Sequence, residues 1–324
     1  MIDIGDIEAA AERLSGIAIE TPLLQNAELD RIAGGTVLLK PECLQRTGSF
    51  KIRGAYNLLS QLSAEQAERG VVAWSSGNHA QGVACAGSML GIHTAIVMPE
   101  DAPAAKLENT RRLGGEVITY DRYSGDREAI ARSLAAERGA AIVPSFEHPH
   151  IIAGQGTVGL EIARQSMSLG LPVDQVLICC GGGGLTSGSA VALKALLPDV
   201  SVYTVEPEFY DDTARSLATG ERVSVTTSKP SICDALLTDA PGELTFDIMR
   251  QLVTSGLVVT EAEVKAAMRF AFRHLKLVLE PGGAVALAAV LATKIDAADK
   301  ITAVVLSGGN VDWDLFASIQ GELT

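Results

Sequence analysis

One lysine, Lys51, lies in the segment Thr47-Gly48-Ser49-Phe50-Lys51-Ile52-Arg53-Gly54, among small and polar residues. The segment follows a predicted strand at 37–40 and precedes a predicted helix at 54–62, where a ligand could reach the amine. A lysine amine in a partly desolvated pocket loses some preference for its charged form and can then attack an aldehyde. The cofactor that carries such an aldehyde is pyridoxal 5′-phosphate. Taken alone, Lys51 is also consistent with a solvated lysine at the start of a helix.

Four successive glycines, Gly181, Gly182, Gly183 and Gly184, separate a predicted strand at 175–180 from a predicted helix at 186–197. Glycines let several backbone N–H groups converge on one anion, and the helix N-terminus adds its positive dipole. The spacing matches neither a Walker loop nor the dinucleotide motif G-x-G-x-x-G. We therefore predict a phosphate-binding loop. The alternative is a flexible or closely packed turn, although ordering four glycines is costly.

Two further polar turns follow predicted strands. Ser75-Ser76-Gly77-Asn78-His79 could bind a carboxylate through its amides and hydroxyls, or could only cap a helix, and the His79 ring could equally be a packing residue. Ser307-Gly308-Gly309-Asn310 ends the last predicted strand, at the sheet edge where open α/β sheets bind ligands. The hydroxyl of Ser307 could hydrogen-bond a ring nitrogen without protonating it. The alternative for this turn is again structural.

The acidic segment 206–212 offers hard oxygen ligands. The carboxylates of Glu206 and Asp212, with a backbone carbonyl between them, could hold Mg²⁺ or Ca²⁺. Acidic residues are also favoured at the start of a helix, so the segment has a purely structural explanation as well.

The elements that must position these residues alternate between strand and helix. Strands are predicted at 71–74, 94–98, 116–120, 141–144, 175–180, 201–205 and 301–306, and helices at 3–15, 82–90, 104–113, 127–138, 156–168, 186–197, 213–219, 261–275 and 283–291. This spacing predicts parallel strands joined by right-handed crossovers. At 324 residues the chain is long enough for two lobes. We predict a large cofactor-binding domain formed by 1–69 and 148–324, with a small domain, 70–147, inserted in it.

Composition narrows the class of partner. The net charge of -13 argues against nucleic acid and against anionic membrane surfaces, and favours a small-molecule ligand. The five cysteines show no zinc-ligand spacing, which suggests a reducing, cytoplasmic compartment. The first residues are acidic where a secretory signal would be basic, and no run of about 18 apolar residues occurs, so we expect a soluble protein.

Five motifs occur in a fixed order, namely T-G-S-F-K-I-R-G, S-S-G-N-H-A-Q-G, I-A-G-Q-G-T, G-G-G-G-L and L-S-G-G-N. In this combination the chain resembles the fold type II pyridoxal-phosphate enzymes, and within them the serine/threonine dehydratase and serine racemase group. The resemblance covers about 7–312. It implies an α/β fold with two open, twisted, mainly parallel sheets flanked by helices, as in the tryptophan synthase β-like proteins, and a homodimer.

The same resemblance implies roles for individual residues. Lys51 would bind the cofactor covalently, with Phe50 beside it, Asn78 at the phenolic oxygen, Ser307 at the pyridine nitrogen and Glu280 near the ring. The glycines at 181–184 would hold the phosphate. Ser75, Ser76, Gly77 and His79 would surround the substrate carboxylate, and Ser76 would act as acid and base on the face opposite the lysine. Glu206, the Tyr210 carbonyl and Asp212 correspond to a divalent-cation site.

The implied activity is a dehydratase, or ammonia-lyase, that converts β-hydroxy α-amino acids such as L-threonine and L-serine to a 2-oxo acid and ammonia. Arg127 matches an arginine of the racemase-like members and could bind a second carboxylate, so 3-hydroxyaspartate dehydratase, serine racemase or both are alternatives. Arg127 could also be an exposed arginine at a helix start. The chain departs from the group at Cys233-Asp234-Ala235, where Ala-Asp-Gly is usual, which leaves the substrate open. A protein that binds the cofactor without turnover is a third possibility.

Overall fold

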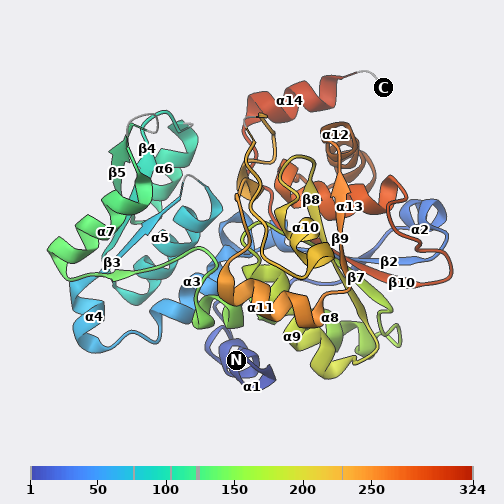
Figure 1. Cartoon of the computed structure of the whole chain (residues 1–324), viewed down its shortest axis with the longest axis horizontal. Helices are drawn as coiled ribbons and strands as arrows, with labels where there is room; N and C mark the ends of the chain where they lie inside the picture. Colours follow the sequence, from blue (N-terminus) through green and yellow to red (C-terminus); the bar gives the residue numbers. More distant parts are fainter. Residues whose placement is uncertain (1, 76, 103, 122–124, 228, 323–324) are drawn as a thin grey trace.

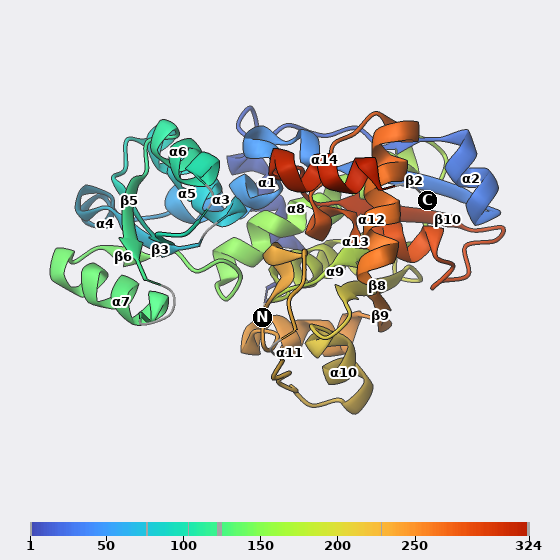
Figure 2. The same ribbon diagram turned by 90° about the horizontal axis from the view of Figure 1, so that it is seen from above.

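The computed structural model describes residues 2–75, 77–102, 104–121, 125–227 and 229–322. Two lobes, each built on its own sheet, lie side by side in Figure 1, the smaller one on the left. Figure 2 shows the same separation from above. The two mainly parallel sheets flanked by helices confirm the predicted fold class.

The small lobe is a parallel sheet with strand order β5-β4-β3-β6. Its elements are β3 (Val71–Trp74), β4 (Thr94–Pro99), β5 (Glu116–Tyr120), β6 (Ala141–Ile142), α4 (Ala64–Arg69), α5 (Asn78–Leu90), α6 (Ala104–Arg112) and α7 (Arg127–Arg138). Successive strand residues point to opposite faces. Val71 therefore packs in one core with α5, and Val72 packs in another with α7. Helices thus cover both faces, which explains the uninterrupted apolar run of these strands.

The large sheet has the order β1-β2-β10-β7-β8-β9, and its edge strand β1 is antiparallel to β2. Its strands are β1 (Leu24–Gln25), β2 (Thr36–Pro41), β7 (Gln175–Cys179), β8 (Ser201–Pro207), β9 (Ser255–Val259) and β10 (Ile301–Leu306). Around it lie α1 (Ile4–Arg13), α2 (Ala27–Ala33), α8 (Pro149–Ser168), α9 (Gly184–Leu196), α10 (Asp212–Thr219), α11 (Glu243–Leu252), α12 (Glu261–Phe270), α13 (Pro281–Leu291) and α14 (Trp313–Gly321). Shorter turns are η1 (Glu42–Leu44), η2 (Arg46–Gly48), η3 (Asp234–Leu236) and the π-helical turn η4 (Ala271–Leu275).

The helix that begins at the lysine, α3 (Lys51–Leu59), lies at the junction of the lobes. Its residues Ile52 and Leu58 share a core with strand β3 of the small lobe, while Gly54 lies against α8 of the large one. A Cβ on Gly54 would come within 2.9 Å of the Ile151 carbonyl, so only glycine permits this approach. The division of the chain at 69/70 and 147/148 stays a prediction.

Beneath α3 lies a buried ionic cluster. The guanidinium of Arg53 contacts Glu42 at 2.8 Å and Glu161 at 2.5 Å, and Lys40 contacts Glu161 at 2.6 Å. The side chains of Arg53, Glu42 and Lys40 are fully buried. With Glu161 the cluster has two positive and two negative charges. They balance only while all four groups are present, because a lone buried charge is strongly unfavourable.

Several element bounds differ from those predicted. The lysine helix starts at residue 51 instead of 54, α8 starts at 149 instead of 156, and the helix predicted to reach 275 changes to a π-helical turn at 271. No strand or helix had been predicted for β1, α2, α4, β9, α11 and α14. Among the described residues, no helix is both long enough and apolar enough to cross a lipid bilayer.

Candidate active site

A cavity of about 870 Å³ lies between the lobes, at the carboxyl ends of β3, β7 and β10. It brings together every described residue predicted for the cofactor or the substrate: Phe50, Lys51, Ser75, Gly77, Asn78, His79, Arg127, Gly181, Gly182, Gly183, Gly184, Glu280 and Ser307. Ser76, predicted as the second acid and base, lies outside the described residues. The three predicted cation ligands are not part of the lining. Segments far apart in the sequence thus form one site.

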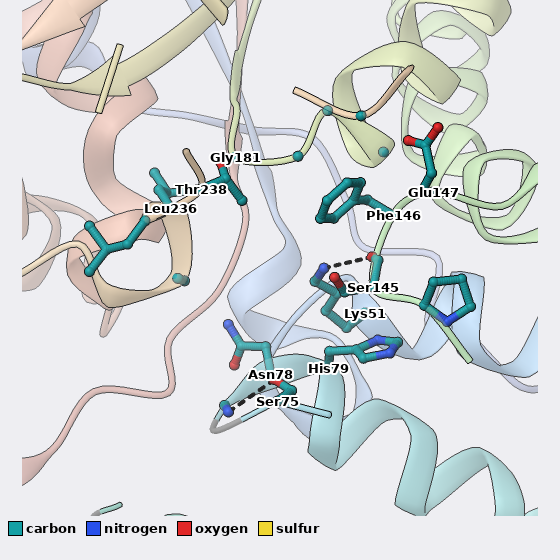
Figure 3. Close-up of a pocket in the computed structure, with 18 of the residues that line it drawn as sticks. Lys51, Ser75, Asn78, His79, Ser145, Phe146, Glu147, Gly181, Leu236 and Thr238 are labelled. Carbon is teal, nitrogen blue, oxygen red and sulfur yellow. Dashed lines mark hydrogen bonds between the residues drawn. The ribbon is translucent and has the colours of Figure 1, made fainter. Parts of the chain in front are cut away.

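Lys51, the first residue of α3, points into this cavity (Figure 3). Its amine donates a hydrogen bond to the Ser145 carbonyl at 3.0 Å and lies 5.2 Å from the centre of the Phe50 ring. Burial lowers the pKa of Lys51 to about 8, although the nearby Cys179 and Glu280 oppose the shift. A lysine with this pKa is neutral often enough near neutral pH to act as a nucleophile or a base.

An amide network crosses from one lobe to the other at Asn78. Its Nδ2 donates to Glu280 Oε1 at 2.5 Å, and its Oδ1 accepts from Asn310 Nδ2 at 2.7 Å. Asn310 also donates to the Thr47 carbonyl at 2.8 Å, in the segment that leads to the lysine. Burial raises the pKa of Glu280 to about 7, and the hydrogen bond from Asn78 opposes this rise. The network fixes the orientation of the Asn78 amide at the cavity wall.

The glycine loop joins β7 to α9. Gly183 is the N-cap of α9 and has φ 91°, a left-handed conformation that favours glycine. The N-terminus of α9 therefore opens onto the cavity with its first backbone N–H groups unpaired within the helix. Such an end binds anions, and a phosphate is the expected ligand.

Ser307 follows β10 and lies beside Cys179 at the end of the neighbouring strand. Burial raises the pKa of Cys179 to about 11, so a neutral hydroxyl and a neutral thiol face this part of the cavity. A neutral donor or acceptor of this kind suits an unprotonated ring nitrogen. Lys51, the glycine loop and Ser307 together fit the aldehyde, the phosphate and the ring nitrogen of pyridoxal phosphate.

On the small-lobe side, Ser75 Oγ accepts a hydrogen bond from the Gly77 amide at 3.2 Å. The Nε2 of His79 lies 2.9 Å from the Val143 carbonyl, and since a carbonyl only accepts, Nε2 carries the proton. Burial, and secondarily the charge of Lys51, lowers the pKa of His79 to about 3. The ring is therefore neutral, and its unprotonated Nδ1 cannot bind a carboxylate. Only the backbone of His79 can serve the role predicted for it.

Arg127, the first residue of α7, is exposed at the cavity rim. Within the described part of the chain it has no ion-pair partner, whereas Arg132 one turn further on pairs with Glu128 at 2.6 Å. Arg132 also lies over the Trp74 ring, 5.9 Å from its centre. A guanidinium in this position at the rim is available to an anionic ligand.

Glu206, near the end of β8, and Asp212, the first residue of α10, are not part of the cavity lining. Glu206 is fully buried, and its carboxylate accepts from the amides of Thr213 at 3.0 Å and Ala214 at 2.7 Å. Neither carboxylate oxygen of Asp212 has a hydrogen-bond partner among the described residues, and burial raises its pKa to about 7. Tyr210 donates its hydroxyl to the Lys229 carbonyl at 3.0 Å. The described residues hold no cluster of three or more Asp, Glu, His or Cys suited to a metal, yet this buried pair of carboxylates has the chemistry of a hard-cation site.

Sequence reasoning missed several lining residues. Lys106 of α6 forms an ion pair with Asp234 of η3 at 2.8 Å and so bridges the lobes. Ala235, the departure from the group's usual glycine, does line the cavity, with its Cβ facing Gly282. Ser145, Phe146 and Glu147 also line it. Their only signal in the sequence was their place after a predicted strand.

Comparisons with known proteins agree with this geometry. The L-threo-3-hydroxyaspartate ammonia-lyase of Pseudomonas sp. is 44% identical over 314 residues, which cover 97% of each chain. A threonine deaminase structure from T.th. superposes with a TM-score of 0.90 at 42% identity, covering 96% of this chain and 99% of that one. Maize serine racemase superposes with a TM-score of 0.92 at 36% identity, covering 98% and 96%. The family model described as pyridoxal-phosphate dependent enzyme matches residues 14–308. The chain, with its cavity lysine and its glycine loop, belongs to the family of pyridoxal-phosphate dependent enzymes.

Proposed function

We propose that the protein is an ammonia-lyase that converts β-hydroxy α-amino acids, serine or threonine first, into a 2-oxo acid and ammonia. The observation that carries this proposal is the Lys51 amine, with a pKa of about 8, in one cavity with the glycine loop and the Asn78 network. The similarity to a threonine deaminase and a hydroxyaspartate ammonia-lyase supports the choice of reaction.

The bound cofactor supplies an electron-withdrawing ring that acidifies the Cα–H of the amino acid. In our proposal the glycines at 181–184 hold its phosphate, Asn78 contacts its phenolic oxygen, and Ser307 faces its ring nitrogen. Lys51 Nζ removes the Cα proton, for which a pKa near the working pH is optimal. Lys51 Nζ returns that proton to the β-hydroxyl, which leaves as water, and the enamine that remains tautomerises to an imine that water hydrolyses to the 2-oxo acid and ammonia. Ser75, Gly77 and the His79 backbone orient the substrate carboxylate.

The test is turnover by the purified holoenzyme. We expect 2-oxo acid and ammonia in equal amounts from serine or threonine, and loss of the reaction in Lys51→Ala. Cofactor binding without 2-oxo acid from any hydroxy amino acid would instead support a binding protein without turnover. Borohydride trapping of the cofactor on a lysine other than Lys51 would refute the assignment of the site.

Arg127 favours a second candidate, L-threo-3-hydroxyaspartate as the substrate. Its guanidinium at the rim could bind the second carboxylate, as a bidentate contact worth about 2 kcal/mol. Arg127→Ala should then lower kcat/KM for hydroxyaspartate by about tenfold or more, while the value for serine stays within about twofold. Arg132→Ala is the matched control, because that guanidinium is already paired with Glu128. Equal losses for both substrates would remove the reason for this candidate.

Serine racemase activity is an alternative outcome at the same site, with Ser76 as the proposed acid and base on the opposite face. Chiral analysis of serine recovered from the assay tests it. Formation of D-serine that persists in Ser76→Ala would exclude this role for Ser76.

We further propose a divalent cation, Mg²⁺ or Ca²⁺, held by Glu206, the Tyr210 carbonyl and Asp212. The buried Asp212 carboxylate, without a hydrogen-bond partner among the described residues, supports this site. A cytoplasmic homodimer is also proposed. Light scattering of the holoenzyme and cell fractionation test the two parts separately, and a monomer, or a protein recovered outside the cytoplasm, would contradict them.

A further inference from the structure

The segment 143–148, which leads from the small lobe back into the large one, contacts the site at nearly every residue. The Val143 carbonyl accepts from His79, and the Ser145 carbonyl accepts from Lys51. Phe146 follows, next to Lys51 in Figure 3, and Glu147 lies beyond it. We call this segment the strap. None of the functional motifs in the sequence includes it.

Phe146 explains two of the four glycines. A Cβ on Gly182 would overlap the Phe146 ring, and a Cβ on Gly184 would lie 3.0 Å from Phe146 Cβ. The aromatic side chain therefore packs directly on the backbone of the loop, at a distance that only glycine permits. One face of the loop is in this way closed by the strap.

Helix α11 closes the other face. A Cβ on Gly183 would lie 2.6 Å from Met249 Cε and 2.8 Å from Thr245 Oγ1. The Thr245 hydroxyl also donates to the Gly182 carbonyl at 2.6 Å, which ties the helix to the loop. The glycine loop is thus clamped between Phe146 and α11. This leaves little of the freedom that four glycines would have in solution.

The strap also holds α11 in place. Glu147 Oε1 accepts from the Leu244 amide at 2.6 Å, in the first turn of the helix, where a carboxylate is favoured by the dipole. A Cβ on Gly242 would overlap the other oxygen of Glu147. Two consecutive strap residues therefore set both walls of the clamp.

We propose that Phe146 and Glu147 are positioning residues that keep the glycine loop in its anion-binding shape, so that the strap sets the affinity for the cofactor phosphate. Ser145 lies in the same segment, and its carbonyl accepts a hydrogen bond from the Lys51 amine. The strap therefore contacts both the phosphate-binding loop and the lysine. The proposal rests on membership of the cofactor family and is independent of the amino acid that is turned over.

The test compares the apoprotein's affinity for pyridoxal 5′-phosphate with its affinity for pyridoxal, which has no phosphate. Phe146→Ala should weaken binding of the phosphate form by about tenfold, about 1.4 kcal/mol, while pyridoxal binding stays within about twofold. Glu147→Ala should act in the same direction. Glu147→Gln keeps an acceptor for the Leu244 amide and should bind nearly as the wild type. Phe272→Ala, an exposed ring outside the cavity lining, is the control for loss of a phenylalanine.

A double-mutant cycle between Gly182 and Phe146 distinguishes a direct contact within the clamp from a general loss of stability. Gly182→Ala alone should weaken cofactor binding, because the new methyl group meets the Phe146 ring. In the background of Phe146→Ala the ring is absent, so the same substitution should cost less, giving a non-additive pair. Thermal unfolding of each apoprotein shows whether it is folded, and Phe146→Leu replaces Phe146→Ala if the latter is not. Strict additivity, or wild-type phosphate selectivity in both Phe146→Ala and Glu147→Ala, would overturn the proposal. Because no substrate is used, an error in the proposed reaction cannot produce either result.

Discussion

Replacing Lys51 by methionine should stabilise the apoprotein. Burial lowers the pKa of Lys51 from 10.5 to about 8, and each pKa unit corresponds to about 1.36 kcal/mol. The charged amine therefore destabilises the folded state by about 3 kcal/mol at pH 7. Methionine avoids that cost but forfeits the hydrogen bond to Ser145, worth about 1 kcal/mol. We expect a net gain of about 2 kcal/mol in the free energy of unfolding, an upper bound because Lys51 keeps some contact with solvent through the cavity.

The dependence on pH has a definite sign. Below pH 8 the amine is charged in both states, and the whole penalty is present. Between pH 8 and about 10.5 the unfolded chain binds more protons than the folded one, so wild-type stability rises with pH. The advantage of Lys51→Met should therefore shrink over this window.

Urea unfolding of the apoproteins at pH 7 and pH 10 measures both effects. Lys229→Met, a substitution of an exposed lysine, is the control and should change stability by less than about 0.5 kcal/mol. A Lys51→Met protein that is less stable than wild type at pH 7, or whose advantage grows with pH, would refute the assignment of a desolvated amine.

Three further outcomes follow from the structure. Glu42→Gln leaves Arg53 and Lys40 with Glu161 as their remaining acidic partner, so urea unfolding should show a loss of about 3 kcal/mol, and a loss below about 1 kcal/mol would contradict the role of the buried cluster. Gly183→Ala should cost at least about 2 kcal/mol because of its left-handed backbone and the nearby Met249, whereas Gly181→Ala, whose Cβ would lie 3.5 Å from the nearest atom, should cost less than about 1 kcal/mol. Equal costs at the two positions would show that crowding is not the cause. A saturating divalent cation should stabilise the protein by about 2 to 3 kcal/mol through Glu206 and Asp212 in thermal unfolding, and a chelator that changes neither stability nor activity would exclude the cation site.

The parts of the site that the sequence predicted are those whose chemistry is local. The lysine at a helix start and the four glycines between a strand and a helix could be interpreted from the residues next to them in the sequence. Both line the cavity. The strap could not be predicted, because Ser145 and Phe146 act on Lys51 and Gly182, which are distant in the sequence. The ion pair between Lys106 and Asp234 spans 128 residues and has no local pattern either.

The start of α8 shows a second kind of failure. Residues 149–155 have no amphipathic pattern because Ile151, Ile152 and Gly154 are all buried, on several sides of the helix. Gly154 looks unfavourable for a helix when considered alone. In the structure a Cβ there would lie 2.6 Å from the Arg53 carbonyl, so the glycine is required by the neighbouring helix α3. Contacts between helices outweighed local propensity.

The clamp on the glycine loop divides the cavity into two ends with different capacity for change. At the phosphate end, a single added methyl group on Gly182 or Gly183 meets the side chains of the clamp, so these two positions tolerate almost no variation. At the rim, Arg127 is exposed and faces open space, and many side chains would fit in its position. Substitutions at the rim alone could therefore change the substrate of this fold, by evolution or by engineering, while the residues that bind the coenzyme stay the same.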